Sequence, residues 1–182
     1  MKIQFFGGTT FGVFGKEARI MFDPTAENAE KSLDFATFSN GEAVKGIEAK
    51  KTLLLPGEFE ISNVLVRGIS SRLENTVYKV VIEDMAIAHF GNLAETPTSK
   101  FFETLGENVD IALINVSENF PVKKIKEVLE DVDPRMVIFG GDPTFFPQIT
   151  AEFGVQTTET NPYSISRSQL SEEKTDYFFL PL

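Results

Sequence analysis

The chain offers very few side chains that could carry out chemistry. It contains a single histidine, His89, and no cysteine. An imidazole can act as a general base or bind a metal ion, because its ordinary pKa is close to neutral. The absence of cysteine excludes disulfides, thiolate nucleophiles and cysteine-bound zinc. The central question is therefore whether any chemistry survives in a chain with one imidazole.

The other candidate residues are isolated polar side chains that follow apolar segments. They are Asp23, Asn40, Glu42 and Asn92, which lies three residues after His89. We expect Asp23 to hydrogen-bond to loop backbone, as aspartate does in turns. We expect His89 to donate to a carbonyl at the end of a strand, because histidines are more often satisfied locally than catalytic.

The overall charge limits the classes of partner. The 182 residues include 17 Lys and Arg against 27 Asp and Glu, which gives a net charge of -10 and a pI near 4.6. A negative field repels phosphate backbones and anionic lipids, so we expect neither nucleic-acid nor membrane partners. The apolar stretch at the N-terminus is too short for a signal peptide, and we expect a cytoplasmic protein. With 42% hydrophobic residues, one domain over residues 1–182 is expected.

Short strands are expected throughout the N-terminal half. The segments 11–14 and 19–22 flank a turn and predict a hairpin, and a second hairpin is predicted from 58–61 and 64–68. Glu58 and Glu60 share one face of that hairpin and are expected to be solvated. Further strands are predicted over residues 2–6, 34–38, 52–55, 78–82 and 85–89.

Helices and strands alternate in the C-terminal half. Thr96 and Pro97 are expected as the N-cap and first residue of a helix that Gly106 ends. Helices are also predicted over 121–132 and 146–153, between buried strands at 110–116 and 136–139, the latter ended by Gly140. Strands at 164–166 and 177–180 close the chain. This order predicts a layered α/β sandwich.

Six segments add a more specific indication of the fold. They are Met1–Phe11, Ile20–Pro24, Leu55–Ile61, Ala88–Leu93, Arg135–Gly141 and Leu170–Thr175. In this order they resemble the metallo-β-lactamase superfamily, in its short ascorbate-lactonase-like branch of zinc-dependent hydrolases. The resemblance implies an αβ/βα four-layer sandwich with a metal site at one edge, between the two sheets.

The chain departs from this family at its metal ligands. The family motif His-x-His-x-Asp-His follows a strand, and here the matching segment reads Asn40-Gly41-Glu42-Ala43-Val44, with alanine in place of the aspartate. Asn92 replaces the aspartate that bridges two metals. Gly141 replaces the last histidine, and Gly8 stands where the branch often has Gly-His-Ser. The resemblance therefore implies a metal site whose ligand positions have all changed.

Zinc needs three protein ligands and an open position for catalysis. Only one charged donor remains among Asn40, Glu42 and Asn92, so we expect no metal and no other cofactor. We predict a degenerate member of the family, without a competent zinc site, that acts as a binding or protein-interaction module. Its partner is expected to be a second copy or another protein. The sequence names no small-molecule ligand.

Two alternatives remain open. The first is a hydrolase of the same superfamily that cleaves an ester, a lactone or a phosphodiester. Its weak or non-standard site would combine Asp23, Asn40, Glu42, His89 and Asn92, with zinc or another divalent metal. The second alternative is a purely structural protein. The sequence does not decide whether the former metal site is an open pocket or is filled, by small neutral groups or by nearby phenylalanines such as those at 35 and 38 or at 145 and 146.

Overall fold

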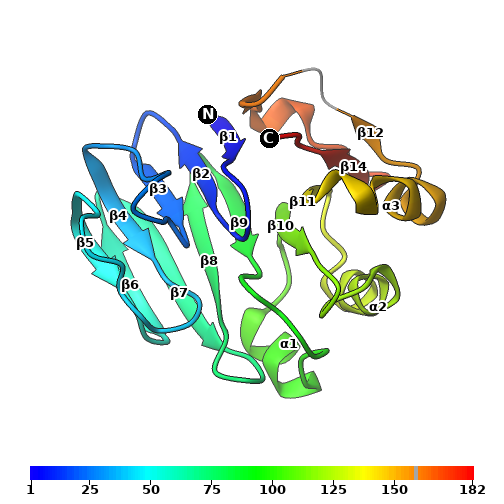
Figure 1. The fold of residues 1–182 in the computed structure, drawn as a ribbon, viewed down its shortest axis with the longest axis horizontal. Coiled ribbons are helices and arrows are strands. Elements are labelled where there is room, and N and C mark those ends of the chain that lie inside the picture. The colour runs from blue at the N-terminus through cyan, green and yellow to red at the C-terminus, as the bar shows by residue number, and fades with distance from the viewer. Residues whose placement is uncertain (158–159) are drawn as a thin grey trace.

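Two β-sheets pack face to face in this protein (Figure 1). The structure is a computed structural model that describes residues 1–157 and 160–182. Within these residues the first sheet has six strands in the order β13-β1-β2-β3-β4-β5. They are β1 (Lys2–Phe5), β2 (Phe11–Phe14), β3 (Arg19–Phe22), β4 (Leu33–Thr37), β5 (Ala49–Leu53) and β13 (Tyr163–Ser164). The strands β3, β4 and β5 run parallel, whereas β1, β2 and β3 are antiparallel neighbours.

The second sheet has eight described strands in the order β12-β14-β11-β10-β9-β8-β7-β6. They are β6 (Gly57–Ile61), β7 (Val64–Ser70), β8 (Thr76–Ile82), β9 (Met85–His89), β10 (Ile111–Val116), β11 (Met136–Gly141), β12 (Gln156–Thr157) and β14 (Asp176–Phe179). The strands from β6 to β9 are antiparallel, and those from β9 to β12 are parallel. The parallel half is apolar on both faces because helices cover its outer side.

The α-helices of the described chain pack on the outer face of the second sheet (Figure 1). They are α1 (Ser99–Leu105), α2 (Val122–Val132) and α3 (Phe146–Phe153), and two short 3-10 helices span Pro143–Phe145 and Arg167–Gln169. Apolar side chains at helical spacing on α2, including Ile125 and Val128, pack against Val137 and Phe139 of β11. None of the helices that the structure describes is long and apolar enough to cross a membrane.

The outer face of the first sheet is covered by loops. Met21, Leu33 and Ala36 point away from the second sheet and form a buried cluster with Phe38. Ile47, from the connection between β4 and β5, packs against this cluster together with other partly buried side chains. In the described chain, loops therefore form this outer layer, whereas helices form the layer on the opposite side.

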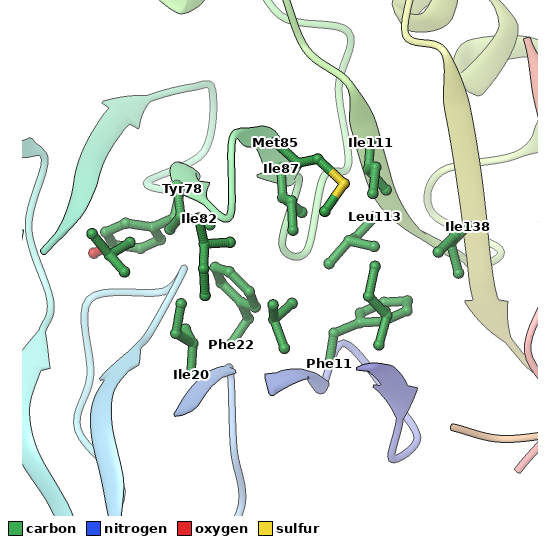
Figure 2. Packing of buried hydrophobic residues seen from close by; sticks show 14 of the residues in the cluster. Phe11, Ile20, Phe22, Tyr78, Ile82, Met85, Ile87, Ile111, Leu113 and Ile138 are labelled. Carbon is green, nitrogen blue, oxygen red and sulfur yellow. The ribbon is translucent and has the colours of Figure 1, made fainter. Parts of the chain in front are cut away.

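The main core lies between the sheets (Figure 2). Phe11, Ile20 and Phe22 of the first sheet point toward Ile87 and Leu113 of the second. Strand alternation explains this arrangement, because successive residues point to opposite faces of a sheet. The apolar area removed from water here stabilises the fold by about 25 cal/mol per Å².

Most of the predicted elements are confirmed. Both predicted hairpins are present, as β2 with β3 and as β6 with β7. The strand at 85–89 and the helix at 146–153 have the predicted bounds. The layered α/β sandwich is also confirmed, with two mixed sheets and few helices.

Several predicted boundaries are wrong. The N-cap of α1 is Thr98, whose side chain accepts from the Phe101 amide, and not Thr96. The strand β11 does not end before Gly140, because both glycines pair with β10 through Asn115 and Val116. The strand predicted at 52–55 is instead Ala49–Leu53. Its start was missed because the first half of the strand is mostly polar and exposed and lacks an apolar pattern. The closing strand predicted at 164–166 is instead Tyr163–Ser164.

Candidate functional site

The candidate site lies where the segments after β4 and β9 meet. The carbonyl of Ser39, after β4, accepts a hydrogen bond of 2.8 Å from the amide of Thr76 at the start of β8. Gly91, after β9, packs directly on the side chain of Ser39, and it adopts a φ of +63°. A β-carbon at this position would overlap Ser39, so only glycine permits this contact between the two sheets.

Asp23 joins the end of β3 to the segment that follows β4. Its carboxylate accepts two hydrogen bonds of 2.6 Å, one from the Ser39 amide and one from the Ser39 hydroxyl. The backbone of Asp23 is also fixed, because its carbonyl accepts from the Thr10 hydroxyl at 2.6 Å. The predicted bond from Asp23 to loop backbone is thus confirmed. Both carboxylate oxygens are used to hold a loop in place.

His89 is buried between the sheets, with 1% of its surface exposed. Its Nε2 lies 2.8 Å from the carbonyl of Thr9, which can only accept, so Nε2 carries the hydrogen. The predicted donation to a carbonyl is confirmed. The ring stacks on Phe22 at a centroid distance of 4.9 Å and meets the edge of Phe11 at 5.8 Å. This environment favours a neutral imidazole.

The charge state of His89 follows from its surroundings. Burial lowers the pKa of His89 below its ordinary value, and this effect exceeds the opposing influence of the Asp23 carboxylate and the Thr9 carbonyl. With Nε2 protonated, Nδ1 of the neutral ring is an acceptor. No hydrogen-bond partner for Nδ1 is found among the described residues. The imidazole is therefore a buried base whose Nδ1 is engaged by no described group.

Two further polar atoms near Asp23 also lack partners. Tyr78, the cross-strand neighbour of His89, has a buried hydroxyl without a hydrogen bond in the described chain. Burial first, and the charge of Asp23 second, raise the pKa of Tyr78 above its usual range. Thr37, whose carbonyl accepts from the Asp23 amide, has an unpartnered buried hydroxyl as well. We call these residues, Asp23, Thr37, Ser39, Tyr78 and His89, the Asp23 cluster.

The other predicted site residues lie at the surface. Asn40 and Glu42 are exposed and interact with each other, since the Asn40 side chain accepts from the Glu42 amide at 3.1 Å. Asn92 is exposed too, and its amide donates to the Asn75 side chain at 2.9 Å. Within residues 1–157 and 160–182, no hydrogen bond or ion pair links these three side chains to Asp23 or His89. The structure thus brings together Asp23 and His89 only.

Asn75 is a site residue that sequence reasoning missed. It is buried, and its amide nitrogen donates to the Phe90 carbonyl at 3.1 Å and to the Ser71 hydroxyl at 3.0 Å. Together with the bond from Asn92, these contacts fix the segment after β9. The available signal was a polar residue directly before the apolar strand β8, and this pattern is too common to identify a role.

The family position on β11 cannot carry a ligand without rearrangement. Gly141 adopts a φ of +146°, and a β-carbon there would lie 2.7 Å from the Val116 carbonyl. A β-carbon at the preceding Gly140 would overlap the ring of Phe5 and approach that of Phe11 to 2.8 Å. These two rings, with centroids 5.0 Å apart, occupy the space beside β11. Gly8, by contrast, is exposed and has nothing within 4 Å of its β-carbon position.

Phenylalanines do fill this region, although not the predicted ones. Phe35 lies in the core between the sheets, but Phe38 belongs to the cluster on the outer face of the first sheet. Phe145 and Phe146 pack with the helices on the outer face of the second sheet. The rings that flank Gly140 and His89 come instead from β1, β2 and β3.

The residues present do not fit a zinc ion. Among the described residues, no group of three or more His, Cys, Asp or Glu side chains could hold a metal. Zinc requires about three such donors at about 2.0–2.3 Å. Here the one imidazole is enclosed by aromatic rings, and Asp23 is bonded to Ser39 through both oxygens. The donor chemistry and the packing agree on this point.

Two mixed sheets packed face to face, with helices on an outer face and loops of both sheets meeting at one edge, define the metallo-β-lactamase class of folds. The chain belongs to the beta-lactamase superfamily, because the sequence model of the beta-lactamase superfamily domain matches residues 2–139. No curated protein matches the chain.

Solved structures agree with the fold. A candidate Zn-dependent hydrolase of the metallo-beta-lactamase superfamily from Thermotoga maritima has a TM-score of 0.83 at 19% identity and covers 100% of both chains. A candidate metal-dependent hydrolase from Parabacteroides distasonis has a TM-score of 0.68 at 12% identity, over 97% of this chain and 91% of its own. Igni18, a metallo hydrolase from Ignicoccus hospitalis, has a TM-score of 0.61 at 15% identity, over 91% of this chain and 99% of its own. At these identities the likeness concerns the fold alone.

Proposed function

We propose that this protein is a member of the superfamily without a competent zinc site, and that it acts as a non-catalytic protein-interaction module. The observation that carries the proposal is the composition of the edge where the sheets meet. Its buried groups are a neutral imidazole, hydroxyls and one carboxylate bonded twice to Ser39. Such a set stabilises a fold, but it cannot hold a divalent metal.

The packing beside β11 supports the same proposal. Gly141 lies against the Val116 carbonyl, and the rings of Phe5 and Phe11 occupy the space next to Gly140. A ligand histidine at 141 would need β10 or β11 to move, because its β-carbon would meet the Val116 backbone. In this proposal, the absence of a metal goes together with aromatic rings that fill the space beside β11. Such packing favours a stable scaffold over a remnant active site.

Metal analysis tests the proposal directly. The protein is purified without chelators, its metal content is measured, and Zn²⁺ and Mn²⁺ are titrated by calorimetry. The Thermotoga maritima protein, prepared in the same way, serves as the positive control. We expect no stoichiometric metal in this chain. Tight binding of one or two equivalents of either metal would overturn the proposal.

A second candidate function is a hydrolase that acts on a small ester, lactone or phosphodiester. The observation in its favour is the unpartnered Nδ1 of His89, under the electrostatic influence of Asp23. Against it, the ring is enclosed by Phe11 and Phe22, so a substrate could not reach Nδ1 without opening the sandwich. Hydrolysis of nitrophenyl acetate or bis(nitrophenyl) phosphate that disappears in His89→Gln would favour this candidate.

A further inference from the structure

In the described chain, each sheet has an edge strand whose outer side pairs with no other strand. These two edge strands lie on the same side of the molecule. β5 is the last strand of the first sheet, and β6 is the last strand of the second. They are consecutive in the chain, joined only by residues 54–56, and Figure 1 shows them together at the left side. Both are five residues long. This side therefore presents two open hydrogen-bonding edges of equal length.

The two edges carry opposite charges. β5 has exposed Lys50 and Lys51, whereas β6 has exposed Glu58 and Glu60. Pairing of β5 with another β5, or of β6 with another β6, would place like charges close together, which is unfavourable. Pairing of β5 with β6 of another copy would place opposite charges together. The charges thus select one of the possible pairings.

Not all of these charges are equally available. Lys50 is paired with Asp34 at 2.7 Å, and Glu58 with Arg67 at 2.7 Å, within the same molecule. Lys51 and Glu60 make no ion pair within the described part of the chain. They are therefore the side chains whose charge a second copy would best complement.

An exposed leucine lies between the two edges. Leu55, in the connection from β5 to β6, is 68% exposed. Leu65, beside β6 and opposite Glu60, is 57% exposed. Exposed leucines that adjoin open strand edges add apolar area to an interface.

We propose that the β5–β6 side, residues 49–61, is the surface through which the protein binds a second copy of itself. In the dimer, β5 of each copy pairs with β6 of the other. A single two-fold axis near Leu55 forms both contacts at once, because each copy presents both edges on one side. Backbone hydrogen bonds across the edges supply the affinity, as in other strand additions. This inference rests on the proposed function and names the partner.

Charge exchange in the full-length chain tests the dimer. The molar mass of the wild type, Lys51→Glu and Glu60→Lys is measured by size exclusion with light scattering over a range of concentrations. We expect a wild-type dimer, and a dissociation constant raised about tenfold or more in each variant, which corresponds to about 1.4 kcal/mol. An equimolar mixture of the two variants should dimerise again, because each altered edge then meets its complement. Thermal melts equal to that of the wild type confirm that both variants fold.

Three outcomes would overturn the inference. The wild type could be a monomer at every concentration, in which case the edge charges serve only to prevent aggregation. The wild type could be a dimer that neither variant weakens, which places the contact elsewhere. The two variants could remain monomeric when mixed, which excludes complementary pairing. A monomer that binds no metal defeats this inference alone, whereas stoichiometric zinc defeats the proposed function whatever the oligomeric state.

Discussion

A buried polar group has several partners at the start of β9, whereas a buried polar group at its other end lacks one. At the start of the strand, the amide of Ala86 donates at 2.8 Å to Asp110, a carboxylate that is only 5% exposed. Arg167 lies 2.7 Å from Asp110, and Arg135 lies 3.6 Å from it. At the other end His89 is equally buried, yet its Nδ1 has no partner in the described chain.

This difference shows how the fold accommodates a buried charge and a buried neutral group. A buried charge needs partners, and Asp110 has three of them. At the other end of β9, neither Asp23 nor His89 forms an ion pair within the described part of the chain. The groups found there are neutral, apart from Asp23, which Ser39 holds through both oxygens. An unpartnered neutral atom costs far less than an unpaired buried charge.

The largest expected effect on stability comes from removing the Asp110 carboxylate at the start of β9. Asp110→Ala leaves the Ala86 amide without its acceptor and two arginines without their anion. We expect the free energy of unfolding to fall by about 2–3 kcal/mol, below the value for a fully buried pair because both arginines are partly exposed. Urea denaturation measures the change. Arg167→Ala and the double variant complete a cycle, and a coupling energy near zero would show that the pair is unimportant.

A smaller effect is expected from the partnered hydroxyl of Thr10. This side chain is 1% exposed, donates to the Asp23 carbonyl at 2.6 Å and accepts from Asn28 at 3.1 Å. Thr10→Val keeps the shape of the side chain and removes both hydrogen bonds. We expect a loss of about 1–2 kcal/mol in the free energy of unfolding, measured by urea denaturation. An unchanged midpoint would mean that the fold does not depend on this contact.

The elements with strong local patterns were predictable from the sequence. The hairpin of β2 and β3, the strand β9 and the helix α3 each have regular apolar spacing and a clear turn or stop. The start of β5 was not predictable, because residues 49–52 are polar or small and pair only through their backbone. Likewise, Thr98 rather than Thr96 caps α1, and two threonines so close together are equally good candidates on local grounds.

The candidate site was predictable only in part. The bonds of Asp23 and His89 followed from residue types at strand ends. Asn75 did not, because its three hydrogen bonds reach the segment after β9 and the hydroxyl of Ser71, contacts that depend on tertiary packing. Nor could the sequence say that Phe5 and Phe11 would pack across Gly140, since this contact joins the two sheets.

The pH dependence of stability provides a third test, which concerns His89 at the end of β9. Because burial lowers the pKa of His89 in the folded protein, the unfolded chain takes up a proton first as the pH falls. This contribution to stability is thus present above the unfolded pKa of about 6.5 and is lost as the pH falls toward the lower folded pKa, by at most about 1 kcal/mol between about pH 6.5 and about pH 5.5. The chain has one histidine, so no other imidazole contributes to this pH dependence.

His89→Gln provides the control for this test. A glutamine amide can still donate toward Thr9 but does not titrate in this range. Urea denaturation at the two pH values should therefore give nearly equal free energies of unfolding for the variant. A variant with the same pH dependence as the wild type would show that other groups are responsible.

The smallest expected effect makes the sharpest contrast with Thr10. Thr37 is fully buried like Thr10, but its hydroxyl has no partner among the described residues. Thr37→Val removes a polar atom that pays a desolvation cost without making a bond, so the free energy of unfolding should stay the same or rise by up to about 1 kcal/mol. Tyr78→Phe should behave in the same way, for the same reason.

Because Thr10→Val and Thr37→Val are the same substitution at similar burial, the difference between their free energies of unfolding isolates the contribution of the hydrogen bonds. If both variants lose stability equally, Thr37 has an internal partner such as a buried water, and the edge around Asp23 is as fully bonded as the end that holds Asp110.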